Sequence, residues 1–446
     1  MKLAIIGGGG FRVPQVFEAV SADDAPVRID ELSLYDISES RLDTIRAIIS
    51  QLAETTKHAP RISVTQDLRE ALTGADFVFS AVRIGGTEGR IIDERTAIDL
   101  GVLGQETVGP GGLAYALRTI PFMVSLAETI RAVAPDAWVI NFTNPAGVVT
   151  EAMRGVLGDR VVGICDTPIG LMRRAVAAVT DSTQRSNADL RFDYVGLNHL
   201  GWLRSVTVGG EDIMPRLLGS DDALSSIEEA RLMGFDWVRA LGALPNEYLY
   251  YYYFTREATE RIRTAPTTRG EFLDRQQTAF FAAPGADPLA TWVHTRHERE
   301  SSYMAESRAS EVERRESDVD GGGYQRVALD LMAALATGRS ATMILNVRNN
   351  ALVPGLPDDA VVEVGCTVDA EGVHPWPIAP VTGEMLGLMT QVKAAERLVI
   401  SAAQEGSREL AWRAFAAHPL VDSVAVARSL VETYCQRFES IGRLLG

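Results

Sequence analysis

Two short segments of the sequence combine residue types that bind metal ions. Cys165 and Asp166 follow an apolar run at residues 161–164, and His199 follows Asn198 at the end of another apolar run. One thiolate and one imidazole suit a borderline divalent metal ion and would leave coordination positions open for substrate oxygens. A single cysteine is more often a small buried hydrophobe, and a single histidine is more often a structural hydrogen-bonding group. The spacing alone leaves both interpretations open.

Tyrosines and arginines supply two further kinds of chemistry. Residues 244–253 contain five of the eleven tyrosines, beginning with Tyr248. Most of these rings suit a core, but a tyrosine beside a cation could have its pKa lowered and act as a base. Arg83, Arg90 and Arg269 would be solvated if they were isolated. If they cluster at one cleft, they would bind phosphate or carboxylate through paired hydrogen bonds.

A glycine run near the start of the chain predicts a dinucleotide site. Gly7, Gly8 and Gly9 end an apolar run and precede a helical pattern, which is where backbone amides and a helix dipole can hold a pyrophosphate. Arg12 stands where the usual motif has its third glycine, so a plain glycine-rich turn is the alternative. Asp36 ends the next apolar run, where a carboxylate would bind ribose hydroxyls and favour NAD over NADP.

Asn144 is the remaining polar side chain that we expect in this cleft. It precedes Pro145 and follows an apolar run, at the carboxyl edge of the sheet where ligands bind in such folds. The residue before a proline is held extended, which suits a side chain directed into a cleft.

The elements that must position these residues form an alternating pattern. Apolar runs separated by amphipathic stretches predict a Rossmann-like, doubly wound parallel sheet of the α/β class over residues 1–192. The predicted strands are residues 3–6, 32–35, 62–65, 77–82, 138–140 and 161–164. We expect residues 193–446 to form a mixed α+β domain for substrate binding and oligomerisation. Its predicted strands are 192–197 and 203–208, and its predicted helices include 224–241, 270–281, 298–315, 324–338 and 387–406, with a helical pair over 409–438.

Composition excludes several classes of function. The 446 residues carry 43 basic and 59 acidic side chains, a net charge of −16, which argues against nucleic-acid and anionic-membrane partners. Three cysteines are too few for a disulfide framework. The sequence shows no targeting signal and no run of 18 apolar residues, so we expect a cytoplasmic protein.

Taken together, these segments resemble the family 4 glycoside hydrolases, the NAD- and metal-dependent 6-phospho-glucosidases. The resemblance extends in order along nearly the whole chain. It rests on the glycine-rich start and on residues 104–112, 141–145, 165–168, 196–199, 244–249 and 349–350. This family is an exception to glycosidase mechanisms that use two carboxylates.

The resemblance implies an oxidative mechanism on a phosphorylated disaccharide or glucoside. NAD⁺ takes hydride from C3 of the sugar, and the metal ion, usually Mn²⁺, holds the C2 and C3 oxygens. A base then removes the acidified C2 proton and the C1–O bond breaks by elimination. Water adds, and NADH returns the hydride.

The resemblance also implies a role for each matching residue. Cys165 and His199 match the metal ligands, Tyr248 the base, and Asp166 the general acid of the α-type members. In the cofactor site, Gly7, Gly8, Gly9, Asp36 and Asn144 match NAD-binding positions. Asn144 and Asn198 match substrate contacts, and Arg90 and Arg269 match phosphate-binding positions. We expect a homodimer or homotetramer.

Two departures bear on the substrate. Many members carry Ser-Thr where this chain has Gly10 and Phe11, so one phosphate contact is missing. Either Arg12 replaces that contact, or the substrate carries a different anionic group. Cys165-Asp166 is commoner in α-type members, whereas sequences of this general type are widely described as 6-phospho-β-glucosidases. We therefore predict a 6-phospho-β-glucosidase. The alternatives are a 6-phospho-α-glucosidase or an α-galactosidase-type member, an NAD-dependent 2-hydroxy-acid dehydrogenase, and an NAD-sensing binding protein that has lost catalysis.

Overall fold

The first half of the chain forms a parallel sheet with helices on both faces. The computed structural model describes residues 1–180, 190–304 and 323–446. Its parallel strands run in the order β3-β2-β1-β4-β5-β6, which confirms the predicted doubly wound topology. The strands are β1 (Lys2–Ile6), β2 (Glu31–Tyr35), β3 (Arg61–Thr65), β4 (Phe77–Ser80), β5 (Trp138–Asn141) and β6 (Val161–Gly163).

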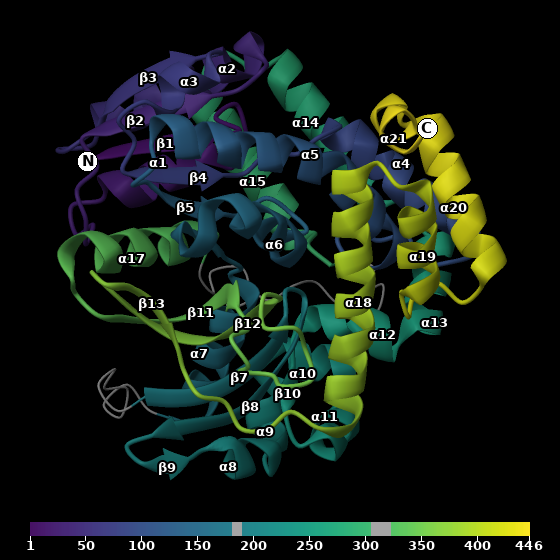
Figure 1. Cartoon of the computed structure of the whole chain (residues 1–446). Coiled ribbons are helices and arrows are strands. Elements are labelled where there is room, and N and C mark those ends of the chain that lie inside the picture. Colours follow the sequence, from purple (N-terminus) through teal and green to yellow (C-terminus); the bar gives the residue numbers. More distant parts are fainter. Residues whose placement is uncertain (181–189, 305–322) are drawn as a thin grey trace.

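Helices connect these strands and cover the sheet (Figure 1). The sequence over this half is rich in apolar positions at helical spacing, and helix α1 begins at Val13, with two residues between it and the end of the glycine run. The helices are α1 (Val13–Ser21), α2 (Glu39–Glu54), α3 (Leu68–Leu72), α4 (Gly86–Asp99), α5 (Gly109–Val133), α6 (Ala146–Leu157) and α7 (Thr167–Val179).

Helix α5 is unusually long and apolar. Among the helices of the described ranges, it alone satisfies length and composition criteria for crossing a membrane, yet 67% of its most apolar window is buried inside the protein. It contacts α4, α6 and α18. Such burial is typical of a core helix.

The second half continues the same sheet with antiparallel strands. Strand β11 joins β6 through Asn346 and Gly163, and the order then runs β11-β12-β7-β8-β10. The predicted strands 192–197 and 203–208 are confirmed as parts of β7 and β8, whereas β11 and β12 were not predicted. The strands are β7 (Leu190–Leu197), β8 (Leu200–Val208), β9 (Glu211–Asp212), β10 (Leu244–Pro245), β11 (Ala341–Arg348), β12 (Val361–Asp369) and β13 (Gly372–Pro375).

The helices of the second half differ from the prediction in two places. The single helix predicted over 224–241 is wrong, because the chain forms three short helices and Gly234 between two of them has φ +83°. Helix α15 ends at Ser301, and the rest of the predicted helix 298–315 lies largely outside the described residues. The helices are α8 (Met214–Leu218), α9 (Asp221–Ser225), α10 (Glu228–Met233), α11 (Phe235–Leu241), α12 (Tyr250–Tyr253), α13 (Thr255–Thr264), α14 (Arg269–Ala282), α15 (Pro288–Ser301) and α17 (Tyr324–Thr337).

The last four helices return to the first half of the chain. Helices α18 (Gly383–Glu405), α19 (Arg408–Ala417), α20 (Val424–Arg437) and α21 (Glu439–Leu445) lie against α4 and α5 (Figure 1). Their apolar side chains form one cluster with those of α5, including Phe415 and Tyr434. The predicted division at residue 192 stays a prediction, and the sheet itself runs on across it.

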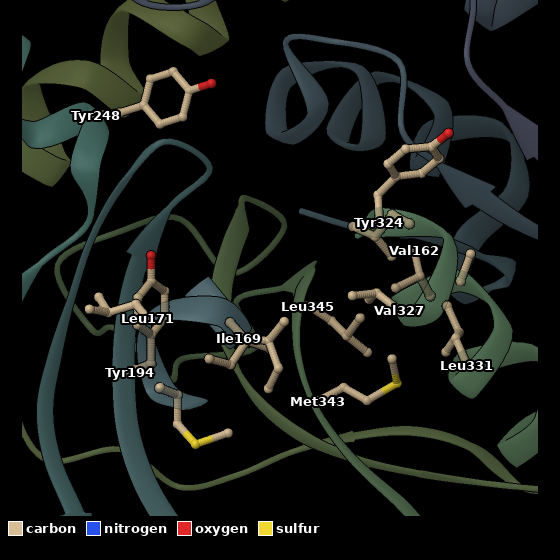
Figure 2. Packing of buried hydrophobic residues seen from close by; sticks show 14 of the residues in the cluster. Val162, Ile169, Leu171, Tyr194, Tyr248, Tyr324, Val327, Leu331, Met343 and Leu345 are labelled. Carbon is tan, nitrogen blue, oxygen red and sulfur yellow. The ribbon is translucent and has the colours of Figure 1, made fainter. Parts of the chain in front are cut away.

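The largest core cluster extends through both halves of the sheet and across their junction. Side chains from α7, β11 and α17 meet in it, among them Ile169, Leu345 and Val327 (Figure 2). Strand β6 and strand β7 are thereby held on either side of the β11–β12 pair, and both strands lead into segments that carry predicted site residues.

Candidate active site

The structure brings Cys165, His199 and Tyr248 together. Cys165 lies just after β6, and His199 lies in the tight turn between β7 and β8 with φ +63°, a conformation that non-glycine residues rarely adopt. The rings of His199 and Tyr248 stack with their centroids 3.7 Å apart and their planes 7° from parallel. The Cys165 thiol is close enough to influence the pKa of Tyr248. Three sequence segments therefore converge on one point.

Tyr248 is placed by a short helical turn. Residues Glu247–Leu249 form a 3₁₀ turn after β10, and the Asn246 side chain accepts a hydrogen bond of 3.0 Å from the Tyr248 amide. Burial, then the neighbouring Glu247 and Cys165, raise the pKa of the Tyr248 hydroxyl. We expected that a neighbouring cation could lower the pKa of this tyrosine. The described groups of the protein raise it instead.

The donor set fits an open metal site. Nδ1 of His199 lies 3.1 Å from the Thr107 hydroxyl, which leaves Nε2 for a ligand, and burial lowers the pKa of this imidazole to about 3. The Cys165 sulfur lies 3.4 Å from the Thr167 hydroxyl. Within the described ranges, no three His, Cys, Asp or Glu side chains gather as a metal-binding group. A metal ion held by Cys165 and His199 would therefore need oxygens from a bound substrate.

A buried carboxylate lies behind this site. Glu363 of β12 accepts hydrogen bonds from the side chains of Asn346 (2.9 Å), Asn198 (3.3 Å) and Tyr194 (3.2 Å). Burial raises the pKa of Glu363 to about 7, and these hydrogen bonds partly oppose the shift. Asn198, predicted as a substrate contact, thus has one amide hydrogen bond to the protein core. The sequence signal for Glu363 is an acidic residue inside an apolar strand.

The glycine run and Asp36 form a tight turn at the end of β1 and β2. The amides of Gly7 and Gly8 donate to the Tyr35 carbonyl at 2.9 and 2.7 Å, and the Gly9 amide donates to Asp36 Oδ2 at 3.0 Å. A Cβ on Gly8 would lie 2.8 Å from that of Leu34. These glycines are needed for close packing of the turn on β2, and helix α1 begins just beyond them.

Asn144 carries an unsatisfied acceptor. Its Oδ1 is buried and has no hydrogen-bond partner among the described groups of the chain. Buried polar atoms are nearly always satisfied in proteins, so an orphaned acceptor at the end of a parallel strand fits a ligand hydroxyl. Together with the turn at Gly7–Gly9, this observation fits a bound dinucleotide and sugar.

Five arginines converge beside these groups. The pKa of Arg299 lies well below its ordinary value because of burial, and then because Arg12, Arg269, Arg90 and Arg83 add their positive charges. No carboxylate among the residues that the structure describes pairs with Arg299. We call these five residues the arginine cluster. Such a concentration of positive charge favours an anionic ligand.

Two members of the arginine cluster are held by an acidic loop residue. Glu106 pairs with Arg83 at 2.6 Å and with Arg90 at 2.7 Å, and Arg90 also pairs with Glu94 at 2.7 Å. Burial opposes the ionisation of Glu106, but the two arginines hold its pKa at about 2. Arg83 and Arg90 are thus fixed in place, and Nη1 of Arg83 still has no hydrogen-bond partner among the described groups.

The remaining members come from three separate segments. The guanidinium of Arg269 donates to the Ser302 hydroxyl and to the Arg299 carbonyl, both at 2.8 Å. The guanidinium of Arg12 lies over the Tyr324 ring, 5.2 Å from its centroid. Burial opposes the charge of Arg12, but Tyr324 and then Asp166 raise its pKa, so the Asp166 carboxylate also faces the arginine cluster. The sequence did not single out Arg299, because it lies in a charge-rich segment that reads as solvated helix.

Comparisons with known proteins cover almost the whole chain. The model described as Family 4 glycosyl hydrolase matches residues 2–181, and that of the Family 4 glycosyl hydrolase C-terminal domain matches residues 194–421. The 6-phospho-beta-glucosidase of Escherichia coli is 30% identical, with 97% of this chain and 94% of the relative covered. The maltose-6'-phosphate glucosidase of Bacillus subtilis is 28% identical, with 97% and 94% covered.

A solved structure shows the same fold throughout. The 6-phospho-beta glucosidase of Thermotoga maritima, solved with manganese, NAD⁺ and glucose-6-phosphate, has a TM-score of 0.82 and 27% identity. The similarity covers 99% of both chains.

Proposed function

Because the chain belongs to family 4 of the glycosyl hydrolases, we propose that it cleaves 6-phospho-β-glucosides with NAD⁺ and a divalent metal ion such as Mn²⁺. The convergence of Cys165, His199 and Tyr248 beside the arginine cluster carries this proposal. It combines a metal-binding pair, a candidate base and an anion site, which are the parts that this chemistry requires.

Each residue near the reacting sugar then has a distinct task. Cys165 and His199 hold the metal ion through sulfur and Nε2. Tyr248 removes the proton from C2, and Asp166 delivers a proton to the leaving oxygen. Asn144 accepts a hydrogen bond from a sugar hydroxyl. When bound, NAD⁺ supplies a hydride acceptor and the metal ion polarises the sugar oxygens.

The turn at the end of β1 binds the dinucleotide. The backbone of Gly7, Gly8 and Gly9 and the N-terminus of α1 contact the pyrophosphate. One oxygen of Asp36 accepts from Gly9 and the other from the Ser38 amide, both at 3.0 Å, which fixes the carboxylate for the adenosine ribose hydroxyls.

The arginine cluster binds the 6-phosphate. The sequence singled out Arg83, Arg90 and Arg269 as arginines that would bind an anion if clustered, and Arg12 as a replacement contact. Arg299 is the one member that it did not single out. Arg12 and Arg299 compensate for the hydroxyl contact that Gly10 and Phe11 cannot make. Guanidinium groups pair with phosphate through parallel hydrogen bonds, so the absence of one hydroxyl leaves affinity for the phosphate intact.

A 6-phospho-α-glucosidase is the second candidate. Asp166 occupies the N-cap position of α7 without a side-chain capping hydrogen bond, so its carboxyl is available as a proton donor. A general acid at this position favours leaving groups of the α-type members. The preferred anomer is therefore decided by comparing kcat/KM for the α- and β-linked 6-phosphoglucosides.

A panel of nitrophenyl α- and β-glucosides and galactosides, with and without the 6-phosphate, tests the proposal. With NAD⁺ and Mn²⁺ supplied, we expect the 6-phospho-β-glucoside to have the highest kcat/KM. Activity restricted to unphosphorylated sugars would contradict the role of the arginine cluster. A faster 6-phospho-α-glucoside would favour the second candidate.

We also propose that the chain works in the cytoplasm as a homodimer or homotetramer. Light scattering of the purified protein would give a mass of two or four times 48.4 kDa. A monomeric mass at working concentrations would contradict this assembly.

A further inference from the structure

A chain of hydrogen bonds leads away from the Tyr248 hydroxyl into the protein. The hydroxyls of Tyr248 and Tyr303 lie 2.9 Å apart, and the Tyr303 hydroxyl donates to Glu247 Oε1 at 2.8 Å. Glu247 is only 3% exposed. Glu247 and Tyr248 are neighbours in the same 3₁₀ turn, whereas Tyr303 comes from the segment just after α15. Neither Tyr303 nor Glu247 has a task in the proposed reaction.

The surroundings of Glu247 suit a carboxylate that changes its protonation state. Glu228 and Glu229 face it from α10, Arg174 faces it from α7, and Tyr303 donates to it. Arg174 makes its ion pair with Glu229, with an Nε–Oε2 distance of 3.2 Å. Burial and the two glutamates raise the pKa of Glu247 to about 8, against the opposing effects of Tyr303 and Arg174. A proton therefore binds here near neutral pH.

A phenol that acts as a base needs a route for its own proton. When the Tyr248 oxygen takes a proton from carbon, the proton already on it must leave. Solvent is a poor acceptor here, because Tyr248 is 8% exposed and its hydroxyl faces Tyr303. A hydrogen-bonded acceptor in fixed geometry can move that proton without water.

We propose that Tyr303 and Glu247 form a proton relay behind Tyr248. As the C2–H bond breaks, its electron pair stays on the sugar and is delocalised onto the C3 ketone oxygen. The C2 proton joins the Tyr248 oxygen, the Tyr248 proton passes to Tyr303, and the Tyr303 proton passes to Glu247, which becomes neutral. The relay runs in reverse when C2 is reprotonated. This inference rests on the proposed function, and both residues act through Tyr248 without touching the sugar.

Two conservative variants test the relay. Glu247→Gln keeps the size of the side chain but removes the acceptor, and Tyr303→Phe removes the link. We expect each to lower kcat by roughly 100-fold or more, with KM changed by less than about threefold. The kinetic isotope effect from deuterium at C2 should rise. In the parent, kcat should rise with pH to a plateau above about 8, and Glu247→Gln should lack this limb.

Tyr253→Phe is the matched control. It removes another tyrosine hydroxyl of the same segment, one that accepts from Trp202 Nε1 at 2.8 Å. Its kcat and isotope effect should equal those of the parent. Parent-like kcat and isotope effects in both relay variants would overturn the proposal.

A measurement without substrate separates this inference from the proposed function. Infrared difference spectra of the unliganded protein should show a carboxyl band that titrates near pH 8 and is absent from Glu247→Gln. Tyr303→Phe should shift the midpoint of that band. Absence of the band from the parent would overturn the relay even if the enzyme is active. If the parent cleaves no sugar phosphate, the proposed function fails, and the infrared titration still decides whether Glu247 is a proton acceptor.

Discussion

At the scale of single residues, the surroundings of Arg299 indicate that the ligand is an anion. It is half-buried beside four other arginines, and no carboxylate of the described chain pairs with it. We expect Arg299→Gln to raise KM for a 6-phosphoglucoside by roughly 10- to 100-fold, because a charge-assisted hydrogen bond contributes about 1.5–3 kcal/mol. The change in kcat should be much smaller. Steady-state kinetics on the phosphorylated substrate measure both values.

The control for this variant is Arg326→Gln. Arg326 is an exposed arginine of α17 that pairs with Asp330 within its own helix. It should keep the parent KM. An unchanged KM in Arg299→Gln would remove Arg299 from the phosphate site.

Glu247 links one residue to the stability of the whole protein. Its pKa rises from 4.5 to about 8 on folding, so the folded state holds this proton more tightly than the unfolded state does. The stability that the proton contributes is present below pH 4.5 and is lost as pH rises through 8. Glu247→Gln has no such loss. Its Tm minus that of the parent should therefore become more positive between pH 5 and pH 8, and a difference independent of pH would contradict the raised pKa.

Sequence reasoning singled out some residues of the proposed site and missed others for a physical reason. Cys165, His199 and Tyr248 stand out by residue type and by the motifs around them, and the structure brings them together. Arg299 and Glu247 look like ordinary charged residues, because their significance comes from burial. Burial depends on contacts between segments that are far apart in sequence. It therefore cannot be predicted from the residues on either side of Arg299 or Glu247.

At the scale of elements, the loop before α5 contacts both the arginine cluster and the predicted metal ligand His199. It carries Glu106, which pairs with Arg83 and Arg90, and Thr107, whose hydroxyl meets His199. The first turn of α5 packs so closely on this loop that a Cβ on Gly111 would lie 2.1 Å from the Gln105 carbonyl oxygen. A Cβ on Gly112 would likewise lie 2.5 Å from the Thr107 carbonyl oxygen, so placement of this loop depends on both glycines.

Gly111→Ala tests that dependence. We expect it to destabilise the protein by about 1–3 kcal/mol and to lower activity, because backbone must move to admit the methyl group. Gly155→Ala is the matched control, since a Cβ there meets nothing within 4 Å on α6. It should stabilise the protein by roughly 0.5–1 kcal/mol through helix propensity. Chemical unfolding measures both, and equal stabilities would contradict the close packing.

Local pattern predicted the first half of the fold better than the second. Five of the six parallel strands are largely buried and read as apolar runs that are easy to recognise, whereas the edge strand β3 is partly exposed. Strand β12 contains Glu363, whose charge breaks its apolar run, and β11 contains Asn346, which bonds to that glutamate. Because these buried polar residues interrupt the apolar runs, the sequence pattern did not predict β11 and β12, the two strands that join the halves of the sheet.

At the scale of the whole molecule, the site lies where distant parts of the chain meet. The glycine turn, Asp36 and Cys165 come from the parallel half of the sheet, and His199, Tyr248 and Arg299 come from later segments. A net charge of −16 is consistent with an anionic substrate because five arginines are concentrated at one place. The fold thereby gathers the proposed cofactor site, the proposed metal-binding pair and the arginine cluster.

The proposed function is tested most directly by cleavage of nitrophenyl 6-phospho-β-glucoside, followed together with NADH absorbance while NAD⁺ and Mn²⁺ are supplied or withheld. We predict that release of nitrophenol requires both, that no net NADH accumulates, and that Cys165→Ser and Tyr248→Phe reduce the rate by at least about 100-fold. Cleavage that persists after both cofactors are removed, or NADH formed in proportion to substrate consumed, would contradict it.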